Sequence, residues 1–254
     1  VIGAGPGGYV AAIRSAQLGM DTVIVEGERA GGTCLIRGCI PSKVMIHAAH
    51  KFHDLAKHAK DGGHMGISIP GPAELEMSSL KGWKDGIVDR LNKGVEHLLK
   101  ASGAELITGW AEFKDAKTVI VGDLQIEAEN VILANGSVPI ELPFMKYGDG
   151  VISSREALDI DESLDHLVVV GGGYIGLELG IVHRMLGAKV TIVEAMDSIL
   201  PIFDKELRRP LELFLKKNKV KVNTGVFAKG VEKLDNGKLK LNFIDKNNAD
   251  EESK

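Results

Sequence analysis

The sequence predicts an α/β fold built around two strand–helix–strand units. Residues 1–28 align without a gap on residues 169–196, a shift of 168 positions. Each copy opens with apolar strand residues, passes through a Gly-x-Gly-x-x-Gly loop into an amphipathic helix, and ends in a second strand that stops at a glutamate. Short alternating segments after each copy are typical of small antiparallel meanders. We therefore predict two domains with parallel sheets, helices and small meanders, at residues 1–140 and 141–254.

Apolar periodicity and turn residues place the remaining elements in order. Between the copies we expect helices at 42–60 and 77–101, a glycine- and proline-rich loop at 62–72, and strands at 105–108, 118–121, 124–126 and 131–134. Pro139 and Pro143 mark a linker into the second copy. Beyond it we expect a helix at 204–217, which Pro210 should kink or divide, and strands at 220–222 and 238–244.

Composition indicates an ordinary globular protein. Of the 254 residues, 44% are hydrophobic and 26% charged, and the net charge of -4 gives no reason to expect nucleic acid or an anionic membrane as partner. The sequence contains neither a membrane-spanning run nor a signal peptide, so we expect the cytoplasm or an organelle matrix. Only two residues precede the first glycine, and no closing element follows the last strand, so we expect the chain to be truncated at both ends.

Each glycine-rich loop has the pattern that holds a dinucleotide pyrophosphate in a Rossmann-like domain. Its glycines are Gly3, Gly5 and Gly8 in the first copy and Gly171, Gly173 and Gly176 in the second. Glu26 and Glu194 each lie 18 positions after the last glycine of their loop, where a carboxylate accepts the hydroxyls of an adenine ribose. Glu194 would repel a 2′-phosphate, so the second site should prefer NAD over NADP. The alternative is that the glycines only pack and the glutamates are solvated strand ends.

Both cysteines of the chain lie in the stretch GGTCLIRGCIPSK, at Cys34 and Cys39. In a reducing compartment such a pair is catalytic, metal-binding or inert. A zinc site usually needs four ligands and no second cysteine pair exists, which favours redox chemistry over metal binding. Our hypothesis is that the two sulfurs form a redox disulfide beside a flavin. Several histidines share one predicted helix, and we interpret them as a polar face and predict no metal site; they are His47, His50, His53 and His58.

The two dinucleotide loops and the cysteine stretch together resemble the flavoprotein disulfide reductases. Within that family, the chain resembles the dihydrolipoamide dehydrogenases, and in particular the forms that serve branched-chain 2-oxo acid complexes, in the segments GGTCLIRGCIPSK, GGGYIGLELG and VTIVEAMDSILP. The resemblance implies FAD in 1–140, NAD in 141–254, and a C-terminal interface domain that is absent here. It also implies oxidation of dihydrolipoamide by NAD+, a lipoyl domain and an acyltransferase core of a 2-oxo acid dehydrogenase complex as partners, and a homodimer.

The resemblance also assigns the redox residues. It makes Cys39 the sulfur that faces the flavin and Cys34 the sulfur that exchanges with substrate. A helix start at Cys39 would stabilise its thiolate, in agreement with this division. Lys43, one turn later, would place a cation at the flavin ring, and in the family this lysine pairs with a glutamate at the position of Glu178.

Further cofactor contacts follow from the resemblance. They are Thr33, Ala111, Asn135, Gly136, Ser137, Tyr174, Ile175 and Val226, with Ala111 near the FAD adenine and Val226 at the NAD adenine. The chain departs from the family at Ile36, where asparagine is usual, and at Asn135, where threonine is usual. The family's catalytic histidine lies on the interface domain of the partner subunit. None of the eight histidines here has that context, so we expect no turnover by this chain alone.

Two alternatives remain open at this point. One is an NAD(P)H-dependent reductase of the same family that acts on another disulfide or on a metal ion. The other, from a different class, is a dinucleotide-binding module without catalysis. The presence of both cysteines together with Lys43 and Glu178 favours an enzyme, because a binding module needs none of the four.

Overall fold

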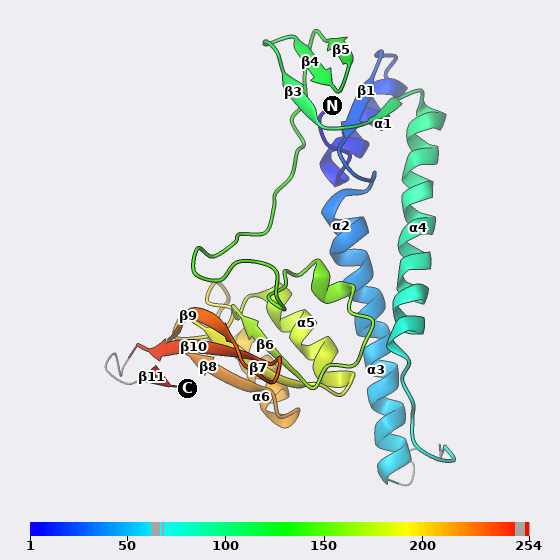
Figure 1. The fold of residues 1–254 in the computed structure, drawn as a ribbon. Helices are drawn as coiled ribbons and strands as arrows, with labels where there is room; N and C mark the ends of the chain where they lie inside the picture. The colour runs from blue at the N-terminus through cyan, green and yellow to red at the C-terminus, as the bar shows by residue number, and fades with distance from the viewer. Residues whose placement is uncertain (62–66, 68, 247–251, 254) are drawn as a thin grey trace. The chain divides into compact units, whose positions relative to one another are not determined.

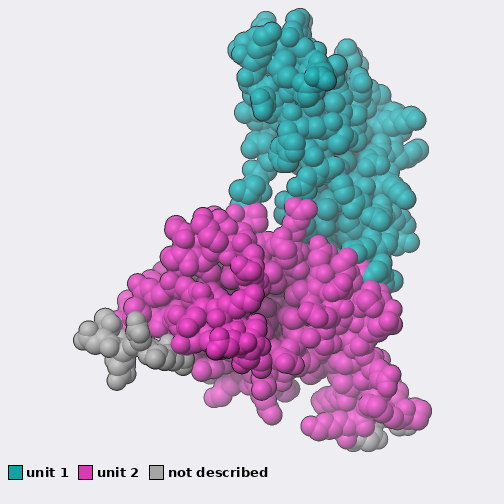
Figure 2. Space-filling view, in the orientation of Figure 1, with its two compact units in different colours: residues 1–43, 82–138 teal, residues 44–81, 139–254 magenta. Residues whose placement is uncertain are grey.

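The chain divides into two compact units, coloured separately in Figure 2. Unit 1 comprises residues 1–43 and 82–138, and unit 2 comprises residues 44–81 and 139–254. The structure, a computed structural model, describes residues 1–61, 67, 69–246 and 252–253. The predicted loop at 62–72 therefore lies in part outside the described residues. Two long helices, α3 (Cys39–Asp61) and α4 (Met77–Ser102), contribute residues to both units.

Unit 1 is a parallel sheet with a small antiparallel meander (Figure 1). Its remaining elements are α1 (Pro6–Gln17), β1 (Val23–Glu26), α2 (Gly32–Arg37), β2 (Glu105–Thr108), β3 (Ala111–Phe113), β4 (Thr118–Val121) and β5 (Leu124–Glu127). β1 pairs with β2 in parallel, with Glu26 opposite Thr108. Ile2 forms parallel bridges to Val25 on one side and to Leu133 on the other. Ile2 therefore occupies the central position of this sheet.

Unit 2 repeats this plan with longer strands. Its elements are the 3₁₀ turn η1 (Glu156–Leu158), β6 (His166–Val170), α5 (Tyr174–Met185), β7 (Lys189–Glu194), α6 (Lys205–Lys217), β8 (Lys221–Thr224), β9 (Val226–Lys233), β10 (Leu239–Asp245) and β11 (Glu252–Ser253). The parallel sheet has the order β6-β7-β8, and Glu194 lies opposite Thr224. β9, β10 and β11 form a separate antiparallel sheet. Each unit thus carries one strand–helix–strand motif and one meander, as the repeat predicts.

Each unit has its own apolar core. In unit 1, α1 and α4 pack around Ile24 and Leu99, both fully buried. In unit 2, α5 and α6 pack around Ile192 and Leu215. Burial of such side chains contributes about 1.5–3 kcal/mol each, which is why the apolar stripes of the helices decide their positions.

The predicted strands at 105–108 and 118–121 are confirmed without change, and the predicted helices are confirmed with small shifts at their ends. The predicted strand at 131–134 is wrong, because this segment forms only an isolated bridge, between Leu133 and Ile2. Pro210 does not divide α6, which runs from Lys205 to Lys217 and packs Leu211 and Leu215 against the core beyond the proline, and the kink stays a prediction. Along α4 the burial of the apolar residues varies: Leu80, Val95 and Leu99 are buried, whereas Trp83, Leu91 and Leu98 are exposed.

No helix among the described residues combines the length and apolar character that crossing a membrane requires.

Candidate functional site

The first glycine-rich loop has the close backbone packing that a dinucleotide loop requires. α1 begins at Pro6, and Gly5 precedes it without any side chain that caps the helix. The first-turn N–H groups therefore remain directed out of the N-terminal end, where an anion binds. A Cβ atom on Gly8 would lie 1.7 Å from the carbonyl oxygen of Gly3, so only glycine fits there. The residues present fit a pyrophosphate at this helix start.

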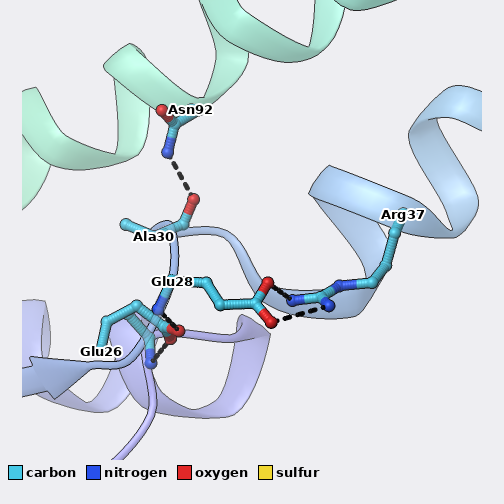
Figure 3. Close-up of polar contacts among 6 residues, drawn as sticks. Glu26, Glu28, Ala30, Arg37 and Asn92 are labelled. Carbon is cyan, nitrogen blue, oxygen red and sulfur yellow. Dashed lines mark hydrogen bonds and ion pairs between the residues drawn. The ribbon is translucent and has the colours of Figure 1, made fainter. Parts of the chain in front are cut away.

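The carboxylate of Glu26 is held at the end of β1 by two backbone groups. The N–H of Ala4 donates to Oε2 at 2.7 Å, and the N–H of Glu28 donates to Oε1 at 2.9 Å (Figure 3). Both hydrogen bonds orient the carboxylate beside the glycine-rich loop. A ribose bound at this loop would meet a fixed pair of acceptors.

The second loop repeats this arrangement in unit 2. The N–H of Gly172 donates to Glu194 Oε2 at 2.5 Å, and the N–H of Met196 donates to Oε1 at 2.7 Å. The donors have the same spacing in both units. One lies 22 residues before the glutamate and the other lies 2 residues after it. A Cβ atom on Gly176 would lie 2.5 Å from the Gly171 carbonyl oxygen. The internal repeat is therefore a repeat of site geometry as well as of sequence.

The two cysteines lie on consecutive helices and form a disulfide, with Cα atoms 4.6 Å apart. Cys39 is the first residue of α3 and is exposed. Cys34 lies within α2, a helix that the sequence analysis did not predict. The reason is the turn before α2, where Gly31 and Gly32 have φ angles of 116° and 61° and let the chain begin a helix directly.

The cysteine segment packs against the first glycine-rich loop. A Cβ atom on Gly32 would lie 2.4 Å from the Cα atom of Gly5, so the two backbones touch at this point. The N–H of Gly31 also donates to the carbonyl of Ala4 at 2.7 Å. The helix that carries Cys34 therefore starts against the loop where a dinucleotide would bind.

Two polar side chains hold the cysteine segment in place, and the sequence analysis had identified neither of them. Arg37 at the end of α2 forms an ion pair with Glu28, with Nη1 3.2 Å from Oε1 (Figure 3). Asn92 of α4 is buried and donates to the carbonyl of Ala30 at 2.6 Å. The sequence offered one indication of Asn92: it is a polar residue between Val88 and Val95, which are buried apolar residues of the same helix.

Nearly the whole chain is similar to proteins of one known family. Residues 1–252 match the family described as pyridine nucleotide-disulphide oxidoreductase. The chain belongs to this family. Among curated members, this pyridine nucleotide-disulphide oxidoreductase is 48% identical to a dihydrolipoyl dehydrogenase of Pseudomonas aeruginosa, over 89% of this chain and 49% of that protein. It is 45% identical to those of Haloferax volcanii and Geobacillus stearothermophilus, over 93% of this chain and 50% of each relative. The chain spans about half the length of the curated relatives it matches.

Solved structures give the same family fold. The HOCl-induced flavoprotein disulfide reductase RclA from Escherichia coli matches with a TM-score of 0.81 and 25% identity, over 96% of this chain and 52% of that chain. LpdA from Mycobacterium tuberculosis matches with a TM-score of 0.84 and 23% identity, over 96% and 55%, and this likeness bears on the fold alone.

The other predicted site residues of this pyridine nucleotide-disulphide oxidoreductase lie in both units. Lys43 is an exposed residue of α3 in unit 1, and Glu178 lies in α5 of unit 2. In unit 1, Thr33 lies in α2, Ala111 starts β3, and Asn135, Gly136 and Ser137 follow the bridge at Leu133. In unit 2, Tyr174 and Ile175 open α5 and Val226 starts β9. Of the two departures from the family, Ile36 packs against the core of unit 1.

One buried titratable residue of this family member was missed by the sequence reading. His183 of α5 is almost fully buried, and its Nε2 lies 3.0 Å from the carbonyl of Ala157 in η1, to which it donates as Nε2–H. Burial lowers the pKa of His183 below its ordinary value of 6.5, and the hydrogen bond to Ala157 partly opposes this. Across the part of the chain that the structure describes, no group of three or more His, Cys, Asp or Glu side chains could hold a metal ion.

Proposed function

We propose that this chain supplies the disulfide, FAD and NAD sites of a dihydrolipoyl dehydrogenase, which oxidises dihydrolipoamide to lipoamide. The observation that carries the proposal is the Cys34–Cys39 disulfide between α2 and α3, because α2 begins against Gly5 of the first dinucleotide loop. Identities of 42–48% to dihydrolipoyl dehydrogenases over at least 83% of this chain support the choice of substrate.

The sites at Glu26 and Glu194 are the binding sites that we propose for the two dinucleotide cofactors. We assign FAD to the loop that ends at Glu26, because the disulfide helix touches that loop, and NAD to the loop that ends at Glu194. When bound, FAD accepts two electrons from the dithiol and delivers them to NAD+ as hydride. The carboxylates orient the ribose hydroxyls of each carrier, and Glu194 disfavours a 2′-phosphate.

The cysteines would carry out thiol–disulfide exchange. A substrate thiolate attacks the Sγ atom of Cys34, the Cys34–Cys39 bond breaks, and Cys39 leaves as a thiolate at the start of α3, where the helix dipole stabilises it. The second substrate thiol then attacks the mixed disulfide and releases Cys34. The substrate loses two electrons and two protons and becomes the cyclic disulfide, and the protein holds the two electrons as a dithiol.

The remaining assignments stay predictions. Lys43, one turn after Cys39, would favour an anionic reduced flavin, and Glu178 belongs to the nicotinamide end of the NAD site. The partners that we propose are a lipoyl domain, the acyltransferase core of a 2-oxo acid dehydrogenase complex, and a second copy in a homodimer. We propose the cytoplasm, or a mitochondrial matrix in a eukaryote, as the compartment.

An anaerobic reduction of the FAD-loaded protein by dihydrolipoamide tests the proposal. The pH should exceed the pKa of the substrate thiol, so that the substrate supplies its own thiolate. We expect bleaching of the flavin, with two dithiols per FAD needed to reduce both the disulfide and the flavin, and NADH on addition of NAD+. Cys34→Ser and Cys39→Ser should each abolish bleaching while FAD stays bound. Bleaching that survives either substitution would exclude the disulfide route.

The same assay separates the rival functions. A reductase for another disulfide or for a metal ion would react with dihydrolipoamide no faster than with other dithiols, but would pass electrons from NADH to its own substrate. A binding module without catalysis would bind dinucleotides and show no bleaching with any thiol. We expect dihydrolipoamide to react at least about tenfold faster than a simple dithiol, equivalent to about 1.4 kcal/mol of specific recognition.

A further inference from the structure

An exposed tryptophan lies beside the first carboxylate site. Trp110, in the turn between β2 and β3, is 74% exposed. A Cβ atom on Gly27 would lie 2.7 Å from Cε2, 2.8 Å from Cδ2 and 3.0 Å from Cζ2 of its indole. Cδ2 and Cε2 form the bond shared by the two rings, so Gly27 lies over the face of the indole and not at its edge. One face of the ring is therefore packed, and the exposed area leaves the opposite face open.

The position of the indole is tied to Glu26. The N–H of Gly109 donates to the carbonyl of Glu26 at 2.8 Å, and Thr108 pairs with Glu26 in the parallel register. Gly27 and Trp110 therefore both follow strands at the carboxyl edge of the sheet, the edge at which α/β proteins bind their ligands. A ribose oriented by the Glu26 carboxylate would place its base beside the residues that follow Glu26.

The repeat shows that the second site lacks this feature. Thr108-Gly109-Trp110 corresponds to Thr224-Gly225-Val226, because Glu194 pairs with Thr224 as Glu26 pairs with Thr108. Val226 is only 5% exposed and presents no aromatic surface. The two sites thus share the ribose acceptor and differ at the position where a base would lie.

We propose that the open face of Trp110 stacks on the adenine ring of the dinucleotide bound at the first site. The inference rests on the proposed function, in which this dinucleotide is FAD. A base–aromatic stack adds affinity for the adenosine half without contacting the reacting ring. FAD stays bound through many turnovers whereas NAD leaves after each one, and an aromatic wall at the first site alone matches that difference.

Single-tryptophan proteins test the stack, because the chain contains only Trp83 and Trp110. The probe is ADP added to apoprotein, since it carries the adenine without a flavin that would quench tryptophan at long range. Trp83→Phe leaves Trp110 as the reporter, and we expect saturable quenching by ADP. Trp110→Phe leaves Trp83 of α4 as the matched control, and we expect no change. Quenching of both proteins alike, or of neither, would overturn the proposal.

Affinity provides the second readout. Trp110→Ala should weaken FAD binding roughly tenfold to a hundredfold, the range for loss of one base–aromatic stack, and Trp110→Phe should recover most of the loss. Gly27→Ala keeps the tryptophan but displaces the indole, and should weaken FAD binding to a similar extent. The affinity of each FAD-loaded variant for NAD should not change. Unaltered FAD affinity in Trp110→Ala would reject the stack and leave the proposed function intact, whereas failure of the unsubstituted protein to bind FAD would reject both.

Discussion

The glutamates that end β1 and β7, Glu26 and Glu194, accept hydrogen bonds from backbone N–H groups at identical sequence offsets. Their surroundings differ. The loop of unit 1 touches the helix that carries Cys34 and has an exposed indole at its side, whereas Glu194 is 8% exposed and has the buried Val226 nearby. On the proposed assignment, the shared motif orients the ribose of each carrier. The residues outside the motif then distinguish the carrier that lies next to the disulfide from the other one.

The parallel sheets of the two units also differ, in how the first strand of each repeat is paired. In unit 1, Ile2 has a parallel neighbour on each side, at Val25 and at Leu133. In unit 2, β6 pairs with β7, and within the described ranges its other edge has no partner. Val168 and Val170 of β6 are each 38% exposed. In the described part of the chain, the first strand of the repeat therefore has neighbours on both sides in unit 1 and on one side in unit 2.

The largest effect that we predict comes from replacing the last glycine of each glycine-rich loop, and it differs between the two units. Gly8→Ala places a Cβ atom 1.7 Å from a backbone oxygen and should destabilise unit 1 by roughly 3 kcal/mol or more, with loss of FAD binding. Gly176→Ala, with a contact of 2.5 Å, should abolish NAD binding while FAD stays bound. Gly7→Ala is the stability control, because no atom lies within 4 Å of its Cβ position. Flavin absorbance and thermal unfolding measure both outcomes, and equal stability of the Gly7 and Gly8 variants would contradict the packing.

Removing the carboxylates should break the two sites independently. Glu26→Ala should weaken FAD binding, and Glu194→Ala should weaken NAD binding, each by about 1.5–3 kcal/mol, the usual value of a hydrogen bond to a charged group. Titration calorimetry on both variants checks this. If either substitution weakened both cofactors equally, the assignment of one carrier to each site would be wrong.

As the pH falls, unit 2 should lose stability before unit 1, because unit 2 contains the buried His183. Its folded pKa lies below the ordinary 6.5, so the unfolded chain binds the proton more readily. The stability due to neutral His183 is present above pH 6.5 and falls as the pH drops from there toward the lowered folded pKa. The protection of amides against hydrogen exchange, corrected for the intrinsic pH dependence of exchange, should therefore fall in α5 and η1 with acid and stay steady in β1 and β2. In a His183→Gln variant this pH dependence should flatten, and an unchanged pH profile would show that another group is responsible.

The smallest effect concerns the ion pairs beside the two carboxylates. Arg37–Glu28 in unit 1 is partly buried, with side chains 24% and 33% exposed, whereas Lys246–Asp197 in unit 2 is 52% and 82% exposed. A double-mutant cycle on the first pair should give a coupling of about 0.5–1 kcal/mol, and the same cycle on the second about zero, because solvent screens exposed pairs. Equal couplings would remove this difference between the units.

The functional features that could be predicted from the sequence are those carried by the repeat or by a single motif. Glu26 and Glu194 could be found because both copies keep the same spacing, and the disulfide because both cysteines lie in one motif. α2 was missed because Gly31 and Gly32 are typical of a loop, while here their positive φ angles start a helix.

Other features were hidden by tertiary context. β9 was missed because Gly230, with φ 156°, interrupts its alternation beside a register shift in β10. Trp110 and Asn92 depend on contacts with distant segments, Gly27 and Ala30 respectively, that no local pattern records.

The most direct test of the two-carrier account is a rapid-mixing experiment on the FAD-loaded Glu194→Ala protein. The account predicts that dihydrolipoamide bleaches the flavin of this variant at the rate of the unsubstituted protein, because Cys34, Cys39 and the first site are untouched. Reoxidation by NAD+ at low concentration should slow by roughly tenfold to a hundredfold. Loss of the first phase, or an unchanged second phase, would contradict the account.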